Sequence, residues 1–374
     1  MEHAFTIKIL DILGDLFGTY SRRIYEQSLL LQYINWKTRS AGKGSKARGS
    51  FANLYAIYVL TEDYLEKNYD KSDQYSKYEG AEFSKLLARQ RELPFGAKLQ
   101  NHALNSRMKE EFKKYYPDCE YEPILRNLET NRYWINENLL KVNTDNQSVN
   151  IARAVLQIID EYGKTKLDSF EKFIRTCEEL QNIGLKDAKD VSSFIFSLLA
   201  PDTDARLFEI VSYAILKVYY HDKMIHWGFD PDPENNTGVT ETYHENLKLY
   251  RTGRTNANDG GIDFLMRPLG RIFQVTESLD FKKYFLDIDK IDKYPITFVV
   301  KSEEPIKTLF NKIRDNAEKT YSIDIIVNKY LSCIEELINI GTLSEWFHEL
   351  QKQGRTPDVL REIITQSKVE FNYI

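Results

Sequence analysis

The chain has 374 residues, of which 42% are hydrophobic and 29% charged. This is the balance of an ordinary globular protein, and the length favours two domains. The net charge of −5 and the pI near 5.8 do not indicate a nucleic-acid-binding protein as a whole, so any contact with phosphates must come from local clusters of Lys and Arg.

The N-terminal segment and the cysteines indicate the compartment. Glu2, Asp11 and Asp15 interrupt the first apolar run, which does not fit a signal peptide. No stretch approaches the ~18 uninterrupted apolar residues that a membrane-spanning helix needs. The three cysteines are odd in number and far apart, so they imply neither a disulfide framework nor a zinc knuckle. We therefore expect a cytoplasmic protein that does not enter a membrane.

Residues 1 to about 195 are predicted to be mostly helical. Apolar residues recur at intervals of three and four in the runs 51–67, 81–92, 151–163 and 169–183, and no strand alternation competes with them. Pro201 and the acids around it then interrupt the pattern. The predicted domains are a helical recognition domain, 1–200, and a second domain, 201–374, with mixed helices and strands.

A basic segment lies near the N-terminus. It carries five cations and no acid: Lys37, Arg39, Lys43, Lys46 and Arg48. Its Gly- and Ser-rich setting is unfavourable for a helix, so the segment is predicted to be a mobile loop that suits contact with phosphates.

A second segment, 89–117, has an inventory that suits base reading. Arg pairs bidentately with guanine, and Asn and Gln pair with adenine, in the major groove. The candidates are Lys98, Gln100, Asn101, His102, Asn105 and Arg107. For each residue taken alone, a solvated amphipathic helix is an equally good interpretation.

The second half opens with a predicted helix, 206–220, which carries Glu209 in its first turn. This carboxylate is either a metal ligand pointing over a sheet or a simple complement to the helix dipole. Further along, 294–301 and 321–328 are predicted to be strands, and 326–351 is predicted to contribute C-terminal helices.

Between these elements lies a predicted hairpin. Residues 262–266 and 271–277 are strand-like, and "RPLG" between them favours a type I turn. If Met266 pairs with Arg271, Asp263 lies directly across from Gln274 on one face. Phe264 then points to the opposite, apolar face, which is expected to pack on a helix and to leave the polar pair outside the core.

The polar pair has a geometry that suits a cation. Cβ atoms of cross-strand neighbours lie about 5 Å apart, which lets two oxygens reach one divalent ion. Gly260 and Gly261, beside the second strand, let the backbone of a ligand come close to the sheet. The alternative is a surface hairpin whose Asp263 and Gln274 are merely solvated.

The order of helix with Glu209, hairpin, helix and strand, together with "NDGGID" followed by "FQV", resembles the PD-(D/E)XK nucleases. It is similar to the Mrr-like branch and covers residues 204–301. With its helical N-terminal domain the chain looks most like a type II restriction endonuclease.

The resemblance implies an α/β catalytic domain with a restriction-endonuclease-like mixed sheet flanked by helices. It also implies Mg²⁺-dependent hydrolysis of double-stranded DNA, with Glu209, Asp263 and Gln274 at the metal-binding positions. A homodimer would cut both strands, and a cognate DNA methyltransferase is expected in the same cell.

One position departs from the family pattern. The catalytic Lys expected two residues after Gln274 is replaced by Thr276, which carries no charge. The candidates to take the role of the missing Lys are Lys282 and Lys283, which lie in the helix that follows. Two other interpretations therefore stay open. One is a DNA-binding protein on a catalytically decayed nuclease core, and the other is a helical partner-binding protein with a coincidental hairpin.

Overall fold

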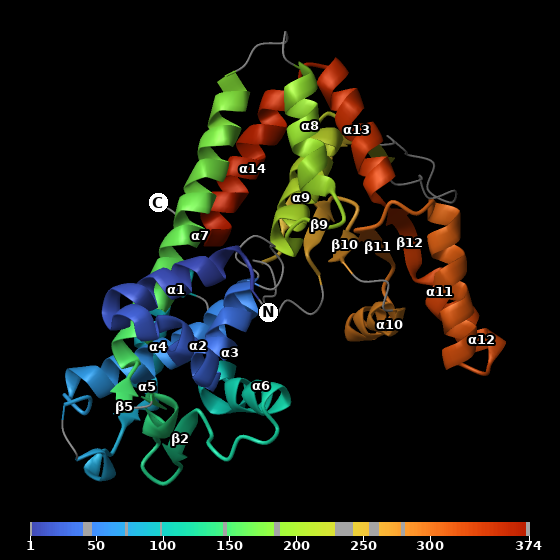
Figure 1. Ribbon diagram of the computed structural model, residues 1–374. Helices are drawn as coiled ribbons and strands as arrows, with labels where there is room; N and C mark the ends of the chain where they lie inside the picture. Colours follow the sequence, from blue (N-terminus) through green and yellow to red (C-terminus); the bar gives the residue numbers. More distant parts are fainter. Residues whose placement is uncertain are drawn as a thin grey trace. The chain divides into compact units, whose positions relative to one another are not determined.

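The computed structural model describes residues 2–39, 47–71, 74–97, 99–144, 148–182, 188–228, 242–253, 262–277 and 281–371. The chain is a mixed α/β protein that divides into two compact units, Met1–Phe173 and Ile174–Ile374 (Figure 1). No helix within the described ranges is long and apolar enough to cross a membrane.

The division lies within a long helix, α7 (Ala152–Asn182), and so comes earlier in the chain than the predicted boundary near residue 200. Side-chain contacts explain the difference. Lys368 pairs with Glu178 of α7 at 3.2 Å, and Gln351 donates to Ser192 at 2.6 Å. The end of α7 and the helix after it therefore belong to the second unit.

The first unit is mainly helical, and a continuous apolar core joins its helices. Its helices are α1 (Ala4–Phe17), α2 (Ser21–Gln27), α3 (Leu29–Thr38), α4 (Ala47–Glu66), α5 (Phe83–Glu92), α6 (Met108–Tyr115) and most of α7, with a π-helical turn over Ala103–Arg107 and short 3₁₀ turns at Gly18–Tyr20, Tyr75–Lys77 and Glu137–Leu139. The amphipathic runs of the sequence predict α4, α5 and α7 correctly. The apolar side chains of α4 are spaced to bury Leu54, Ile57 and Leu60 completely.

Strands also occur in this unit, where the sequence predicts none. They are β1 (Ala81–Glu82), β2 (Ile124–Asn127), β3 (Arg132–Ile135), β4 (Lys141–Asn143) and β5 (Ser148–Asn150). β1, β3 and β2 form one small sheet, and β4 pairs with β5. With two to four residues each, these strands are too short for a period-two pattern to be visible in the sequence.

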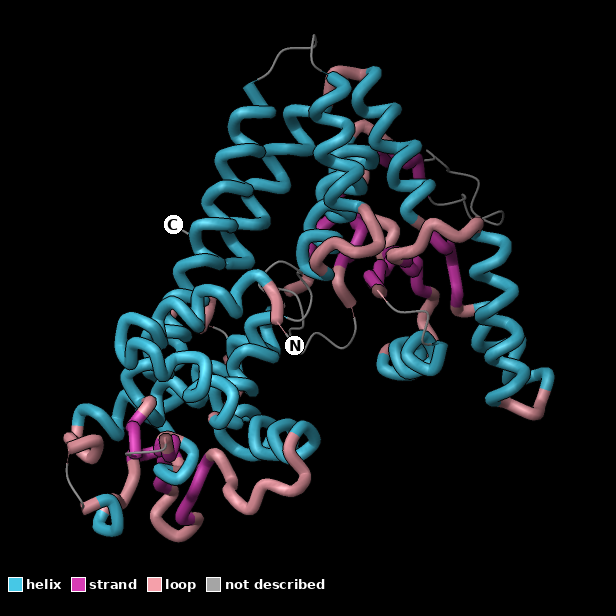
Figure 2. Tube along the Cα trace, in the orientation of Figure 1, coloured by secondary structure: helices cyan, strands magenta, loops and turns pink. Residues whose placement is uncertain are grey.

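The second unit combines several helices with a five-stranded sheet (Figure 2). The helices are α8 (Ala188–Leu199), α9 (Ala205–His221), α10 (Phe281–Lys290), α11 (Ile306–Thr320), α12 (Asp324–Ser332), α13 (Ile340–Lys352) and α14 (Thr356–Phe371). The strands are β6 (Met224–Gly228), β7 (Thr242–Asn246), β8 (Lys248–Arg251), β9 (Phe264–Arg267), β10 (Arg271–Thr276), β11 (Ile296–Val300) and β12 (Ile334–Ile338).

The large sheet is mixed. Its strand order is β12-β11-β10-β9-β8, with β8, β9 and β10 antiparallel and β10, β11 and β12 parallel. β6 and β7 form a separate two-stranded ribbon. A parallel step needs a crossover, and α10 supplies it between β10 and β11 while α11 and α12 supply it between β11 and β12.

Both faces of this sheet are covered. Tyr213 of α9 lies 5.1 Å from Phe264, and Tyr284 of α10 lies 4.7 Å from Phe298, measured between ring centroids. Phe264 pairs with Phe273, while Phe298 pairs with Gln274. Because consecutive strand residues point to opposite faces, α9 and α10 cover opposite faces, which Figure 1 also shows.

Two predicted elements near the C-terminus are wrong. Most of the predicted strand at 321–328 belongs to helix α12, and the strand that joins the sheet is β12, within the segment predicted to be helical. Short apolar runs fit either structure, and pairing decides between them. β12 finds a partner in β11, with Phe298 beside Leu337.

Candidate functional site

The hairpin has the predicted register. Met266 pairs with Arg271 and Phe264 with Phe273, and the turn places Gly270 at a φ of 69°, which a residue without Cβ adopts at low cost. The predicted apolar face is also confirmed, since Phe264 and Phe273 are fully buried and Phe264 contacts α9.

Asp263 lies where β9 begins, beside Gln274. Its N–H donates to the carbonyl of Phe273 at 3.0 Å. Its Oδ2 accepts a hydrogen bond from the N–H of Val275 at 2.7 Å. These two bonds hold the Asp263 carboxylate against the backbone of β10, between Phe273 and Val275.

Gln274 is buried, which differs from the prediction. The polar pair was expected outside the core, but Gln274 is 8% exposed because its face of the sheet is the one that α10 covers. Within the described residues its Oε1 atom has no hydrogen-bond partner. A buried amide oxygen of this kind costs about 1–3 kcal/mol unless something donates to it or a cation contacts it.

Thr276, at the position where the family pattern asks for Lys, is 2% exposed. Tyr284 of α10 lies beside it. Burial raises the pKa of Tyr284, and the side-chain hydrogen bond with Thr276 opposes that rise. The hydroxyl of Thr276 therefore contributes to packing between β10 and α10.

Glu209 is not brought alongside Gln274. It lies on α9, which covers the opposite face of the sheet, and its carboxylate pairs with Arg251 of β8. Arg251 also lies 3.8 Å from Glu370 and donates to Gln366 at 3.2 Å. All three charged side chains of this group are at most 7% exposed, so Glu209 belongs to a buried cluster that joins α9, β8 and α14.

The lysines expected to replace the motif Lys have different surroundings. Lys283 is exposed on α10, and the side chain of Lys282 lies outside the described residues. The glycines Gly260 and Gly261 also lie outside them.

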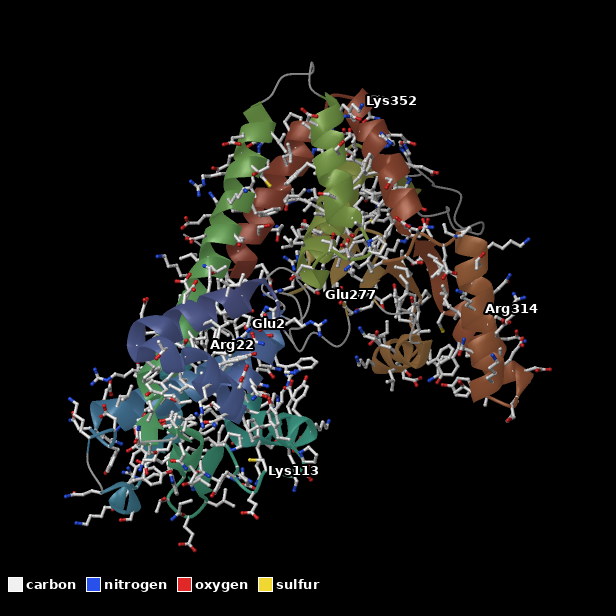
Figure 3. The ribbon with its side chains drawn as sticks, in the orientation of Figure 1. Glu2, Arg22, Lys113, Glu277, Arg314 and Lys352 are labelled. Atoms are coloured by element: carbon white, nitrogen blue, oxygen red, sulfur yellow. The ribbon has the colours of Figure 1, made fainter. Side chains whose placement is uncertain are left out.

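A buried cation near the motif position was missed by the sequence analysis. The N–H of Lys301, at the end of β11, donates to the carbonyl of Thr276 at 2.9 Å, and the Lys301 side chain is only 3% exposed. Its ammonium group pairs with Glu277 at 2.9 Å and donates to the carbonyl of Thr203. Glu277, labelled in Figure 3, directly follows β10. The only sequence signal was a Lys closing a strand that neighbours β10.

The predicted basic loop is partly helical. α3 extends through Lys37, and Arg48 belongs to the backbone of α4, although its side chain lies outside the described residues, as do Lys43 and Lys46 entirely. Lys37 is 11% exposed and pairs with Glu111. Burial lowers the pKa of Lys37, which the ion pair with Glu111 opposes. By contrast, Arg39 is exposed and its guanidinium lies 5.6 Å from the Trp36 ring.

The base-reading candidates gather around the π-helical turn, a feature frequent at functional sites. Gln100, Asn101, His102 and Arg107 are exposed, while Lys98 lies outside the described residues. Asn105 is half-buried and accepts a hydrogen bond from the hydroxyl of Tyr133 at 3.2 Å. Tyr133 is buried, so it supports this turn from the core.

The chain was compared with protein-family models, with curated proteins and with solved structures. No family model, no curated protein and no solved structure matches the chain.

Proposed function

We propose that the protein is a site-specific, Mg²⁺-dependent endonuclease that hydrolyses phosphodiester bonds of double-stranded DNA. One observation carries the proposal. The Asp263 carboxylate is fixed against β10 beside Gln274, whose buried Oε1 atom has no hydrogen-bond partner within the described part of the chain. The order of α9, the β9–β10 hairpin, α10 and β11 also supports it, because the resemblance implies this order.

The donor atoms fit the metal. Mg²⁺ prefers oxygen ligands, and a carboxylate with an amide oxygen supplies two of them. Asp263 and Gln274 would hold the ion. Glu209 would position β8 through Arg251 instead of binding the metal, because the described ion pair commits its carboxylate. When bound, the ion would stabilise the charge that develops on the scissile phosphate.

Recognition of the DNA is assigned to the first unit. Arg39 and Arg107 present exposed guanidinium groups for phosphates or guanine, and Gln100, Asn101 and His102 present exposed polar groups for base edges. Cutting both strands requires two sites, so a homodimer is the expected working unit.

A second function has its own support. Thr276 is buried and hydrogen-bonded to Tyr284, so this position is adapted to packing and supplies no positive charge. A nuclease core that has lost its Lys in this way would retain DNA binding without cleavage. Lys282 and Lys283 are the cations that would supply the missing charge. Lys301 pairs with Thr276 only through its backbone N–H, while its ammonium group pairs with Glu277 and lies 5.7 Å from the Phe208 ring of α9, on the opposite face of the sheet.

Digestion of a mixed panel of plasmid and phage DNA, with Mg²⁺ or with EDTA, tests the proposal. The sharp variant is Asp263→Asn, whose amide oxygen still accepts the hydrogen bond from Val275 while the charge is removed. Asp315→Asn, at an exposed position of α11, is the matched control. We expect discrete fragments from the wild type and the control, and none with EDTA or Asp263→Asn.

The alternatives give different results. Salt-sensitive DNA binding without cleavage by the wild type would establish the decayed-core function. If cleavage occurs, Lys283→Met and Lys282→Met identify which lysine contributes. Absence of both cleavage and DNA binding would overturn both functions.

A further inference from the structure

The ribbon formed by β6 and β7 carries a pair of histidines that the proposed nuclease chemistry does not use. His226 and His244 lie directly opposite each other in the antiparallel register, and both are exposed. Their ring centroids are 4.5 Å apart, with the ring planes at 86°. Their Nδ1 atoms are in hydrogen-bond contact with each other.

Two ring nitrogens that face each other at contact distance repel each other unless a proton or a metal ion lies between them. In a neutral imidazole one nitrogen carries a proton and the other a lone pair. The contact is therefore either a hydrogen bond in which one ring donates, or a pair of lone pairs directed at a shared cation. An exposed hydrogen bond between neutral groups contributes little, because water competes for both partners.

We propose that His226 and His244 form a binding site for a divalent transition metal, of the class of Ni²⁺, Cu²⁺ and Zn²⁺. Imidazole nitrogen suits these ions, whereas Mg²⁺ prefers oxygen. At metal–nitrogen distances of about 2.0–2.1 Å, two tetrahedral ligand nitrogens lie ~3.3 Å apart. The two Nδ1 atoms, which are now in hydrogen-bond contact, need to move only slightly apart to reach this nitrogen–nitrogen distance.

The ribbon supports this arrangement on its other face. Trp227 and Tyr243 occupy the next pair of the register, and their rings stack at 4.7 Å with planes 22° apart. Alternate strand residues point to opposite faces. The stacked rings therefore hold the two strands together on one face of the ribbon, while the histidines are exposed on the other face. Within the described ranges no three His, Cys, Asp or Glu side chains group together, so water would complete the coordination.

The site has a structural consequence for the ribbon. An isolated two-stranded ribbon is only marginally stable in water, and a metal held by one residue from each strand would join the strands. At a free metal concentration of ten times the Kd, we expect opening of the ribbon to become about tenfold rarer.

Calorimetric titration of the full chain with Ni²⁺, in buffer free of chelator, Mg²⁺ and DNA, tests the proposal. We expect saturable binding, and we expect His226→Asn and His244→Asn each to weaken it by at least about tenfold. The control His221→Asn changes an exposed histidine at the end of α9 and should leave the affinity unchanged. The same titrations in the Asp263→Asn background, which removes the carboxylate of the proposed nuclease site, separate the two sites.

Amide exchange gives a second readout. Hydrogen exchange of the backbone amides of residues 224–228 and 242–246 should slow on addition of Ni²⁺ in the wild type. It should not slow in a variant that combines His226→Asn with His244→Asn. Two results would overturn the proposal: no Ni²⁺ binding by the wild type, or binding in the Asp263→Asn background that persists when His226→Asn and His244→Asn are combined. Imidazole ¹⁵N resonances that stay unchanged by Ni²⁺ would assign the contact to a hydrogen bond alone.

Discussion

Gln274 is a residue at which burial and polarity conflict. Its amide lies on the face of the sheet that α10 covers, and within the described residues its oxygen has no donor. Removing the oxygen should relieve the cost of burying it, while a nuclease would lose a metal ligand. Stability and activity are therefore expected to respond in opposite directions.

We predict that Gln274→Met raises the free energy of unfolding by about 1 kcal/mol and abolishes cleavage. Gln274→Glu should bind Mg²⁺ more tightly than the wild type in the absence of DNA, because it adds a negative charge to the ligand set. Urea unfolding and Mg²⁺ titration measure the two effects. A Gln274→Met protein that is less stable and still cleaves would show that the amide has a packing role only.

Lys37 and Arg39 are two residues apart and are expected to differ in function. Lys37 is held by Glu111, whereas Arg39 is exposed. Arg39→Met should reduce the slope of log K for DNA binding against log salt by about 0.9, the value for one lost phosphate contact. Lys37→Met should leave this slope unchanged and reduce stability, because Glu111 loses its cation. The reverse outcome would place Lys37 at the DNA.

At the scale of elements, Arg251 joins three of them. Its guanidinium pairs with Glu209 of α9 and lies near Glu370 of α14, while its own strand β8 is an edge of the sheet. Two carboxylates share one cation in this buried cluster. Arg251 therefore adds an electrostatic link between α9, α14 and the edge of the sheet.

We predict that Arg251→Met costs about 3–5 kcal/mol in the free energy of unfolding, because it removes the cation that the described ion pairs place beside two buried carboxylates. Glu370→Gln should cost much less, since Glu209 keeps its partner. Urea denaturation of both variants compares the two values. Equal losses would mean that the cluster is held by packing and not by charge.

At the scale of the whole molecule, buried tyrosines couple stability to alkaline pH in both units. Burial raises the pKa of Tyr58 and Tyr116 in the first unit to about 12, and likewise of Tyr213 and Tyr220 in the second. In the unfolded chain these groups titrate near 10.

The sign of the effect follows from the protons bound by each state. Between pH 10 and 12 the folded tyrosines keep protons that the unfolded ones have lost, so the free energy of unfolding falls as pH rises through this window. We predict that thermal midpoints are nearly constant from pH 8 to 9 and decrease steeply above pH 10.

Tyr213→Phe isolates one contribution. The hydroxyl of Tyr213 donates to the carbonyl of Leu249 at 3.1 Å, so the variant should lose about 1 kcal/mol at neutral pH. Its loss of stability above pH 10 should be smaller than that of the wild type. An unchanged alkaline profile would exclude Tyr213 as a contributor.

Local periodicity and turn chemistry, which can be read from the amino-acid sequence, predict the long helices and the hairpin register. The apolar spacing of α4 and α7 predicts long amphipathic helices, and the RPLG turn fixes the pairing of Met266 with Arg271. Because the side-chain period of a strand is two, this pairing also fixes which residues share a face with Asp263.

Long-range packing determines which helix covers each face of the sheet and which short apolar run becomes its edge strand. Residues 334–338 became a strand because β11 offers a partner, while most of 321–328 became helical. α10 buries Gln274, Arg251 pairs with Glu209, and the backbone N–H of Lys301 reaches the carbonyl of Thr276 where β10 and β11 pair. These contacts join residues far apart in the sequence, and their energies depend on burial, which no local pattern specifies.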